Sequence, residues 1–477
     1  MLEGWQARQL DSETAEKRDC SFSFWLSSVL AFQPSSCRIM TFEQAARILL
    51  DRQNFIKKDG LDRVYACLGR LGDPHEKISA VHVTGTNGKG SVCALFDSVF
   101  RAAGLRTGLF ISPHLVSLTE RITIDGREMD KEDFAALLEE VFKAGPDLSF
   151  FELLTCMAFL HFERSRTDIA IIEVGIGGRL DTTNVLPRPA LSVITSVDLD
   201  HQKYLGETIG EVAGQKAGII KNGGICLAPM LPEAARSPIL LEAQKQQAQI
   251  RFLAPVFDVA GYDWPRGLMR LRHKKTGEEM ELGLLGPSQV SNATLVYEGV
   301  SVLAGSGGPS VSRAQLVEGF MRVYWPGRFH ILERSGSVFI LDGAHNPEAA
   351  RSFAATFDRS PFKEKSPVFV FGILNDKDYL SVLRTLAPYA AKAVFTRPPS
   401  ERAADPCALA DEFARLRPDA EIEVQENIEA ALSAGAGTGR PTVVLGSFYL
   451  VGAAMKILGR TEREKGPVKA RNGQTVQ

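Results

Sequence analysis

The feature that most constrains the fold is an alternation, from Ser79 onward, between short apolar runs and segments with helical periodicity. AVHVTG is the first such run, and TGLFIS, DIAIIEVG, LSVITSV and GICLAP follow it along the first half of the chain. Nearly continuous apolar runs separated by amphipathic segments are typical of parallel strands joined by covering helices. We therefore predict an α/β fold in which the first half of the chain forms a parallel sheet.

A second α/β series begins after YWPGRF and contains VFILDGAH, VFVFGIL, KAVFTRP, EIEVQE and TVVLGS. A chain of 477 residues exceeds the usual size of one domain, and the proline and glycine within 324–328 are typical of a linker. We predict a larger domain at 40–323, a hinge at 324–328 and a smaller domain at 329–458. Within the larger domain, MRLRHKKTGEEMEL (269–282) predicts an antiparallel hairpin.

The two ends of the chain differ from the rest. Residues 1–39 contain an apolar run, 22–32, that is too short to span a bilayer, and the acidic residues before it disfavour a signal peptide. Residues 459–477 are polar and lack a hydrophobic period. We expect both ends to be disordered and assign a function to neither.

The composition excludes several classes of function. The net charge is −2 and the pI is near 6.5, so the chain carries no electrostatic footprint for nucleic acid or for an anionic membrane. Its 7 cysteines are odd in number, scattered and without C-x-x-C spacing, which argues for a reducing compartment and against a zinc site. We expect a cytoplasmic monomer whose partners are small molecules.

A glycine-rich loop follows the first apolar run, in VHVTGTNGKGS. The usual nucleoside-triphosphate loop has four residues between its glycines and a hydroxyl directly after the lysine, whereas here Gly90 separates Lys89 from Ser91. Between a strand and a helix, such a loop places backbone amides and the helix dipole around an anion. A glycine turn without a ligand is the alternative, but the lysine and serine favour phosphate binding. The candidate residues are Gly85, Thr86, Asn87, Gly88, Lys89, Gly90 and Ser91.

Two further strands end in polar residues. Glu173 closes the strand in IIEVGIGGRLDTTN, and Asp198, Asp200 and His201 follow the strand LSVITSV. In open α/β sheets ligands bind at this carboxyl edge, where a carboxylate, a hydroxyl and an imidazole could hold Mg²⁺ with phosphate oxygens and water. The residues alone leave open whether Glu173 caps a helix and whether His201 is a core residue, because histidine is an unusual ligand for Mg²⁺.

Lys216 lies in EVAGQKAGIIK, four positions after Val212 and three before Ile219, on the apolar side of a predicted helix. A lysine in this place either extends its ammonium group to solvent or is held in the interior for a purpose. Periodicity does not decide between these alternatives. Lys221, at the end of the same segment, is explained by the helix dipole.

Together these motifs resemble one family closely, the folylpolyglutamate synthase/dihydrofolate synthase branch of the Mur-type ATP-dependent ligases. The glycine loop is similar to that family's own variant, in which Gly90 distinguishes the folate branch from its cell-wall relatives. Further motifs follow in the family's order between Thr41 and Leu458: SPHL, ERI, FFELLT, EVGIGGRLDTTN, DHQKYLG, KAGIIK, WPGRF, LDGAHNP and GSFYL. The resemblance implies a P-loop-containing, Mur-ligase-like ATPase domain with a parallel sheet and a smaller, Rossmann-like α/β domain after it.

The resemblance also implies roles for single residues. Ser91, Glu173 and His201 match the Mg²⁺ ligands of the family, and Lys216 matches a lysine that is carbamylated. Carbamylation would turn an ammonium group into an anion near the metal, and it needs an uncharged amine that burial favours. With His345, the lysines Lys89 and Lys216 make up the implied catalytic set.

The remaining implied contacts belong to ATP and the substrates. Besides the glycine loop, the nucleotide-binding residues are Asn292, Arg328 and Asp342. The substrate-binding residues are Ser112, Pro113, His114, Arg121, Phe151, Glu152, Arg402 and Ser447. Arg402 lies in a proline-rich loop, where a solvated surface arginine is an equal alternative.

The implied reaction is ATP-driven amide formation. A carboxylate of dihydropteroate or of a reduced folate attacks the γ-phosphorus of ATP, and the amine of L-glutamate then displaces phosphate from the acyl phosphate. The resemblance leaves open whether the chain uses one of these substrates or both, and whether a monovalent cation takes part beside ATP and Mg²⁺. A cell-wall ligase, a nucleotide-binding switch and a NAD-dependent oxidoreductase are the alternatives, and the spacing of Gly85, Gly88 and Gly90 disfavours the last.

Overall fold

The computed structural model describes residues 40–53, 60–436 and 439–459. The predicted extension at 1–39 and all of the predicted tail beyond Gly459 lie outside this part of the chain. From Phe42 onward the described residues belong to one compact unit, which is built on three sheets.

The first sheet has eight strands in the order β4-β3-β2-β5-β1-β6-β7-β8. From β2 to β8 neighbouring strands are parallel, whereas β3 and β4 extend the edge antiparallel. The predicted parallel sheet is therefore confirmed for its centre and wrong at this edge, where a loop containing Leu118–Arg121 leads into β3 and a short turn joins β3 to β4. The strands are β1 (Ala80–Thr84), β2 (Thr107–Phe110), β3 (Ile122–Ile124), β4 (Arg127–Glu128), β5 (Ile169–Glu173), β6 (Leu191–Ile194), β7 (Ile225–Pro229) and β8 (Gln249–Leu253).

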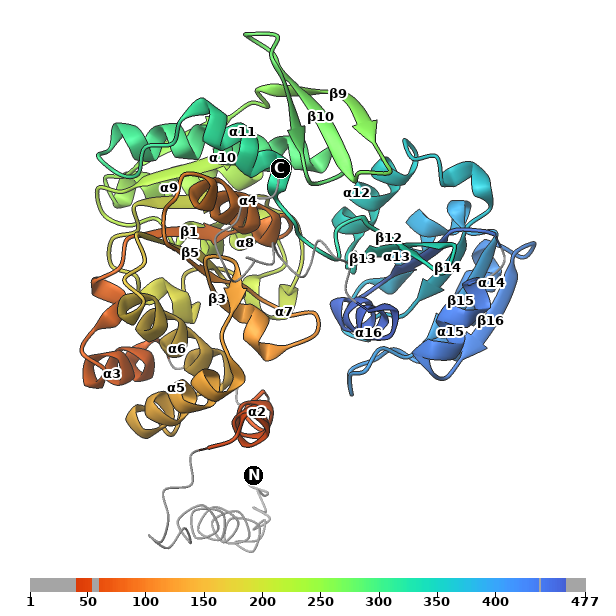
Figure 1. Ribbon diagram of the computed structural model, residues 1–477, viewed down its shortest axis with the longest axis horizontal. Coiled ribbons are helices and arrows are strands. Elements are labelled where there is room, and N and C mark those ends of the chain that lie inside the picture. The colour runs from red at the N-terminus through yellow and green to blue at the C-terminus, as the bar shows by residue number, and fades with distance from the viewer. Residues whose placement is uncertain (1–39, 54–59, 437–438, 460–477) are drawn as a thin grey trace, which may run out of the picture. The chain divides into compact units, whose positions relative to one another are not determined.

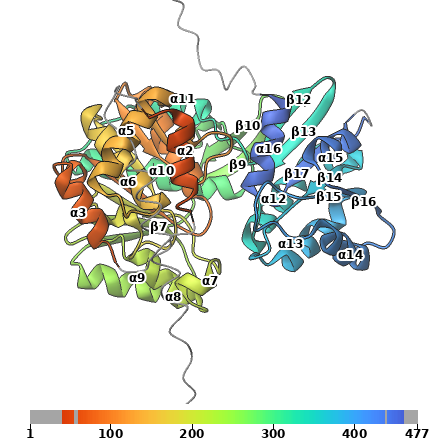
Figure 2. The same ribbon diagram turned by 90° about the horizontal axis from the view of Figure 1, so that it is seen from below.

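Helices cover both faces of this sheet, with α4, α10 and α11 on one side and α5 and α6 on the other (Figures 1 and 2). The helices of this region are α2 (Phe42–Leu50), α3 (Asp62–Arg70), α4 (Lys89–Ala102), α5 (Lys131–Ala144), α6 (Phe150–Arg164), α7 (Gln202–Leu205), α8 (Ile209–Ala217), α9 (Glu233–Lys245), α10 (Ser288–Gly305) and α11 (Arg313–Arg322). The doubly covered α/β architecture is the predicted one.

Helix α4, which follows the glycine loop, is enclosed on all sides. The residues from Gly90 to Phe100 are buried, so the helix has no solvent face over this span. Its neighbours approach so closely that a Cβ on Gly299 of α10 would lie 2.6 Å from the ring of Phe96, and one on Gly319 of α11 would lie 2.5 Å from the Cα of Val99. The periodicity predicted one apolar face; the enclosed helix instead fixes the loop at its start within the core.

A three-stranded antiparallel sheet joins β9 (Phe257–Asp263), β10 (Leu268–His273) and β11 (Glu279–Leu282). Met269 pairs with Leu282 and Arg272 with Glu279, so the hairpin predicted at 269–282 is confirmed. Strand β9 pairs with the free side of β10 as a third strand, which the sequence pattern did not predict.

The last sheet has six strands in the order β12-β13-β17-β14-β15-β16, and it is parallel except for β12. Its strands are β12 (His330–Arg334), β13 (Ser337–Asp342), β14 (Val368–Phe371), β15 (Lys392–Thr396), β16 (Glu421–Gln425) and β17 (Thr442–Leu445). Its helices are α12 (Pro347–Phe357), α13 (Tyr379–Leu386), α14 (Pro406–Leu416), α15 (Ile428–Gly435) and α16 (Phe448–Leu458). The predicted second α/β series is confirmed, and the first strand after the linker is its antiparallel edge.

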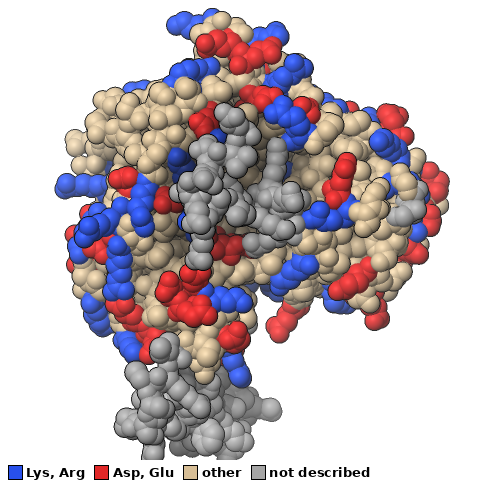
Figure 3. Space-filling model, in the orientation of Figure 1, with Lys and Arg blue, Asp and Glu red and all other residues tan. Residues whose placement is uncertain are grey.

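The strand order determines where polar loops can meet. In the first sheet β1 lies between β5 and β6, so the loops after these three strands emerge at the same carboxyl edge. In the last sheet β13 and β17 are neighbours, and their following loops also emerge together. On the face shown in Figure 3, basic and acidic residues are interspersed, without a field of one sign.

Candidate active site

The glycine loop is held by contacts that leave no room for larger side chains. Gly88 has φ 83° and precedes α4, and a Cβ on it would lie 2.8 Å from Asn292 Oδ1. A Cβ on Gly85 would lie 1.9 Å from the hydroxyl of Thr195, which follows β6 and donates to the carbonyl of Asn87 at 2.6 Å. The loop is therefore shaped by the end of β6 as well as by its own glycines.

Lys89 folds back over this loop. Its Nζ donates to the carbonyl oxygens of Gly85, at 2.9 Å, and Thr86, at 3.0 Å. Burial lowers the pKa of Lys89, an effect that the nearby carboxylates of Glu173 and Asp200 oppose. An ammonium group held among backbone carbonyls at the mouth of a phosphate loop is placed to exchange those partners for phosphate oxygens.

Glu173 ends β5 and is 3% exposed. Its Oε2 accepts from the backbone N–H of Ser112, at 2.7 Å, in the loop after β2. Burial raises the pKa of Glu173, and Lys89 lowers it. The capping alternative finds no support here, because Ser112 belongs to a loop and not to the first turn of a helix.

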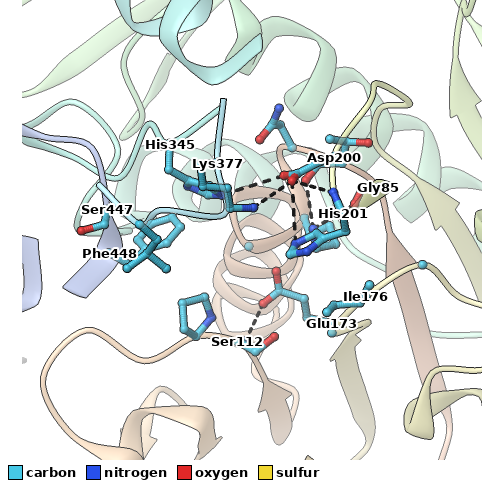
Figure 4. Close-up of a pocket in the computed structure, with 18 of the residues that line it drawn as sticks. Gly85, Ser112, Glu173, Ile176, Asp200, His201, His345, Lys377, Ser447 and Phe448 are labelled. Atoms are coloured by element: carbon cyan, nitrogen blue, oxygen red, sulfur yellow. Dashed lines mark hydrogen bonds and ion pairs between the residues drawn. The ribbon is translucent and has the colours of Figure 1, made fainter. Parts of the chain in front are cut away.

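His201 and His345 approach one carboxylate from two parts of the chain (Figure 4). The Nε2 atoms of both rings lie 4.0 Å from oxygens of Asp200, and Nζ of Lys377 donates to Asp200 at 2.8 Å. Burial lowers the pKa of each histidine to about 4, with Lys377 adding to the effect. Both imidazoles are therefore neutral near pH 7, as a metal ligand or a proton acceptor must be.

The tautomer of His345 follows from its surroundings. Its Nδ1 lies 2.7 Å from the carbonyl oxygen of Gly343, and since a carbonyl can only accept, Nδ1 carries the proton. The lone pair is then on Nε2, the atom that faces Asp200. The ring also packs against Phe448 with centroids 5.5 Å apart, which fixes its plane.

Lys216 lies on α8 and is 2% exposed, so the interior alternative is correct. Burial, with the positive charge of Lys89 as the next cause, lowers the pKa of Lys216 to about 7. A substantial fraction of this amine is uncharged near neutral pH, which is the form that carbamylation needs. Lys221, assigned from the sequence to a helix dipole, instead donates to the carbonyl of Asn184 at 2.8 Å.

The side chains near Glu173 and His201 fit a divalent cation, although the serine is in question. Ser91 Oγ is buried and has no hydrogen-bond partner among the described residues, as an atom that awaits a ligand would have. However, Ser112 and not Ser91 lines the cavity together with Glu173 and His201. A carboxylate, a neutral imidazole and a hydroxyl form a donor set that suits Mg²⁺ or Mn²⁺. In the described part of the chain no group of three or more His, Cys, Asp or Glu side chains is placed to hold a metal ion, so this donor set depends on the serine hydroxyl as its third member.

Three residues from the linker region and the last domain complete the cavity. The guanidinium of Arg328 lies 4.3 Å from the ring centroid of Phe448, and burial lowers its pKa. Ser447 Oγ accepts from the backbone N–H of Leu450 at 3.1 Å and so caps α16. Arg402 lines the cavity with a largely exposed side chain, 3.6 Å from Asp376.

The cavity has a volume of about 220 Å³ and brings together most of the predicted residues. Those that line it are Gly85, Thr86, Asn87, Gly88, Lys89, Gly90, Ser112, Pro113, Glu173, His201, Lys216, Arg328, His345, Arg402 and Ser447. A second cavity of about 790 Å³ begins at the same place, since Gly90, Ser112, Glu173 and Arg328 line both.

Besides Ser91, two predicted nucleotide contacts, Asp342 and Asn292, are absent from these linings, as far as the described residues go. Asp342 accepts from the backbone N–H groups of Phe329, at 2.7 Å, and Ala344, at 2.8 Å. Asn292 donates to Gln289 at 2.8 Å and lies against Gly88. In this arrangement Asp342 holds the chain at the end of the linker and Asn292 supports the phosphate loop; their contact with a nucleotide stays a prediction.

Four predicted substrate residues, His114, Arg121, Phe151 and Glu152, line neither cavity. Arg121 donates to His114 Nδ1 at 2.8 Å and lies over the ring of Phe150, with 5.1 Å to the centroid. Phe151 and Glu152 lie on the first turn of α6, where Glu152 accepts from Ser149 N–H at 2.7 Å. In the described structure Glu152 also pairs with Arg63, at 2.9 Å. These partners give the residues structural roles, and their contact with substrate stays a prediction.

Several site residues carried no signal that sequence reasoning used. Lys377 has a side chain that is 9% exposed and pairs with Asp200 across 177 positions. Asn87 donates to Asn346 at 3.2 Å and to Glu348 at 2.5 Å, which joins the phosphate loop to the start of α12. Asn346 stands within the motif LDGAHNP and Glu348 follows it directly, so that motif could have drawn attention to both, whereas nothing near Lys377 distinguishes it from a surface lysine.

Comparison with known proteins agrees with this geometry. The Mur ligase middle domain model matches residues 83–297, and the Mur ligase glutamate ligase domain model matches 327–448. Dihydrofolate synthase/folylpolyglutamate synthase of Bacillus subtilis is 35% identical over 362 residues, which cover 73% of this chain and 83% of that protein. The chain belongs to the folylpolyglutamate synthase/dihydrofolate synthase family. The resemblance noted from the motifs is thus confirmed.

Members of this family with known structures share the fold. Folylpolyglutamate synthase of Mycobacterium tuberculosis in complex with ADP is 31% identical, with a TM-score of 0.79 over 88% of this chain and 98% of that one. A bifunctional folylpolyglutamate synthase/dihydrofolate synthase with Mn, AMPPNP and L-glutamate bound is 27% identical, with a TM-score of 0.73. A protein of Haloferax volcanii named "Probable bifunctional folylpolyglutamate synthase/dihydropteroate synthase" is 31% identical, and this chain spans about half (50%) of its length.

No helix within the described residues is both long enough and apolar enough to cross a membrane.

Proposed function

We propose that this protein is an ATP-dependent ligase that joins L-glutamate to dihydropteroate and to reduced folates through an acyl phosphate. The observation that carries the proposal is the convergence of Lys89, Glu173, His201 and Lys216 on one cavity at the carboxyl edge of the first sheet. A nucleotide switch needs no such combination of buried charges. The relatives that bind ADP, AMPPNP, Mn and L-glutamate support this assignment.

The first step transfers a phosphoryl group. Loop amides and the Lys89 ammonium bind the β- and γ-phosphates, and the substrate carboxylate attacks the γ-phosphorus in line, giving an acyl phosphate and ADP. Glu173, His201 and a serine hydroxyl would hold a divalent cation, which neutralises the charge on the phosphate oxygens. The low polarity of a buried site strengthens each of these interactions.

The second step forms the amide. The ammonium group of L-glutamate must lose a proton before its nitrogen can attack the acyl carbon. Nε2 of His345 carries a lone pair at the cavity, and Asp200, 4.0 Å away, would stabilise the imidazolium that forms. The nitrogen then attacks, phosphate leaves, and the new amide bond is complete. Arg402 and Ser447 line the cavity and would receive the carboxylates of glutamate, whereas Arg328 would contact the nucleotide.

Lys216 would support the first step in carbamylated form. Its amine, with a pKa lowered to about 7, can add carbon dioxide and become an anion beside the cation site. The role is proposed from burial and from the family's lysine at this position. Measurements of the same activity with and without potassium would test whether a monovalent cation takes part.

Product analysis tests the proposal. The full chain would be incubated with Mg-ATP, L-glutamate and either dihydropteroate or tetrahydrofolate, and product masses and phosphate release would be measured. We expect a gain of one glutamate on both substrates. Gain on one alone would make the enzyme a specialist, and gain on neither, with nucleotide binding intact, would reject the folate substrates and leave a Mur-type ligase with a different carboxylate.

A further inference from the structure

The second residue of α4 packs directly against the linker between the domains. A Cβ on Gly90 would lie 2.7 Å from Cζ2 of Trp325 and 3.0 Å from its Cε2 and Nε1. Gly90 lies inside the helix, so the glycine is explained by this close approach and not by backbone conformation. The indole of Trp325 therefore occupies the space that a side chain on Gly90 would fill.

This space has a particular meaning in phosphate loops. The residue directly after the lysine ordinarily carries the hydroxyl that reaches the cation. Here Lys89 is followed by Gly90, and an indole from the linker takes the place of that hydroxyl. The loop therefore has no hydroxyl at this position, and Gly90 instead contacts Trp325, which lies more than 200 positions later in the sequence.

The linker is fixed to the last domain just after Trp325. Gly327 O accepts from the backbone N–H of Gly343 at 2.9 Å, and Phe329 N–H donates to Asp342 at 2.7 Å. Only Pro326 lies between the residue seated on α4 and the first residue fixed to the last domain. Proline restricts the backbone, so a displacement at Trp325 is passed on to Gly327 with little loss.

The side chain that follows reaches the cavity. Arg328 lines both the 220 Å³ and the 790 Å³ cavity, and Trp325 lines the larger one beside Gly90. A shift of the first turn of α4 on phosphate binding would thus move Arg328 relative to the phosphates. A shift of the last domain would in turn move Trp325 toward or away from the first turn of α4, which carries Lys89.

We propose that Trp325 is a positioning residue, whose indole on Gly90 couples occupancy of the phosphate loop to the placement of Arg328 and the last domain. The inference rests on the proposed function for its catalytic consequence, although the coupling itself needs only a nucleotide. It explains why this loop has glycine after its lysine. Trp325 acts through Lys89 and Arg328 and touches no reacting atom.

The test combines two substitutions at the contact with one elsewhere. Gly90→Ala introduces the Cβ, Trp325→Leu removes most of the indole, and the double variant combines them in one chain. Trp264→Phe is the second tryptophan variant, because Trp264 stacks on Tyr262, with 4.6 Å between ring centroids, and also packs against Phe329, at 5.8 Å, but lines neither cavity. For each variant, kcat and KM for ATP, ADP affinity, unfolding temperature and tryptophan fluorescence on addition of Mg-ADP would be measured.

We expect Gly90→Ala to lower kcat/KM for ATP by about 10²-fold, as displacement of a phosphate loop by about 1 Å does. The double variant should recover at least about threefold of that loss, because the clash is gone and residues in contact are not additive. The fluorescence change on nucleotide binding should persist in Trp264→Phe and vanish in Trp325→Leu.

Additive losses in the double variant, or a fluorescence response that survives in Trp325→Leu, would overturn the coupling. Should Gly90→Ala fail to fold, Trp325→Leu and Trp325→Phe decide by the fluorescence response and by a change in kcat without a matching loss of unfolding temperature. Failure of the wild type to ligate glutamate would reject the proposed function alone, since ADP binding and fluorescence still report the coupling.

Discussion

The carboxyl edges of the two large sheets are built in different ways. After β1, β5 and β6 the first sheet places Lys89 and Glu173 in the interior, where burial shifts their pKa values toward the neutral forms. After β13 and β17 the last sheet uses its polar residues to hold backbone, as Asp342 does with Phe329 and Ser447 with Leu450. The first edge therefore holds buried ionisable side chains, and the second uses its polar side chains to fix the backbone around the cavity.

The largest effect on activity is expected from a substitution at the carboxyl edge of the first sheet. Lys89→Ala removes the ammonium group over the phosphate loop, and we expect kcat to fall by about 10²- to 10³-fold, as for the loss of one strong electrostatic contact to the transition state. The unfolding temperature should change little, because burial of this charge is itself unfavourable. Initial rates and thermal unfolding would measure both.

An exposed lysine provides the control for that variant. Lys245→Ala, at the end of α9, should retain wild-type rates. Coupled ATP hydrolysis and ligation at the wild-type rate in Lys89→Ala would contradict the proposed mechanism.

The second edge has one residue placed for chemistry, His345. We expect His345→Ala to lower amide formation by about 10²-fold, within the range for loss of a general base, while the affinity for ADP stays within about twofold. Rapid quench of a single turnover would separate the steps, with acyl phosphate formed and glutamate transfer slowed. Equal losses in both steps would place His345 among the phosphate-binding residues instead.

The two serines near the cation site offer a sharper comparison. Ser112 lines the cavity beside Glu173, whereas Ser91 does not, so Ser112→Ala should weaken Mn²⁺ binding by about 10-fold and Ser91→Ala by less. Mn²⁺ titration followed by electron paramagnetic resonance measures this without turnover. The reverse order would restore Ser91 as the ligand, as the sequence predicted.

A stability measurement tests the burial of Lys216. Its pKa is about 7 in the folded protein and near the ordinary 10.5 when unfolded, so between these values the unfolded chain binds more protons. Stability should therefore rise with pH between about 7 and 10.5, by at most about 1.4 kcal/mol per pH unit from this group. Below pH 7 both states are protonated and the dependence ends.

Lys216→Met should flatten that dependence relative to wild type when carbon dioxide is excluded. Chemical unfolding at several pH values measures the slope. With bicarbonate present, an added mass of one carbon dioxide on wild type, absent from Lys216→Met, would identify the carbamate. Parallel slopes in the two proteins would show that the Lys216 amine is charged and solvated.

The smallest effect is expected at the rim of the second edge. Arg402 is largely exposed and lies 3.6 Å from Asp376, an arrangement worth at most about 1 kcal/mol of stability. Arg402→Ala should leave the unfolding temperature unchanged and raise KM for glutamate by a few-fold. An unchanged KM would favour the solvated arginine that the sequence left as its alternative.

The sequence predicted most strands of both series because buried parallel strands are continuously apolar, a local signal. It did not predict β3, β4, β8, β9 or β12, since strands at or near a sheet edge need little apolar length and depend on the neighbour they pair with. The helix predicted from the period of α4 is present. Its complete enclosure depends on α10 and α11, which lie about 200 positions later in the sequence.

The same division holds for the site. Lys89, Glu173, His201 and Lys216 stand in motifs with a chemical reason for each residue type, so sequence alone could propose them. Lys377 could not be found, because its significance arises from Asp200, on the other side of the cavity. His114, Arg121 and Glu152 were proposed for the site from the family resemblance; each also has a structural partner, and their contact with substrate stays a prediction.

The hydrogen bonds from Asn87 to Asn346 and Glu348 bear on how such enzymes could be recombined. A last domain taken from a ligase with another amino-acid specificity would bring its own α12 start, and the phosphate loop would meet unfamiliar partners. A chimaera made by exchanging the last domain at the linker should therefore keep Asn346 and Glu348 at these two positions, so that Asn87 retains its partners. The segment that must be kept with the phosphate loop thus includes two residues from beyond the linker.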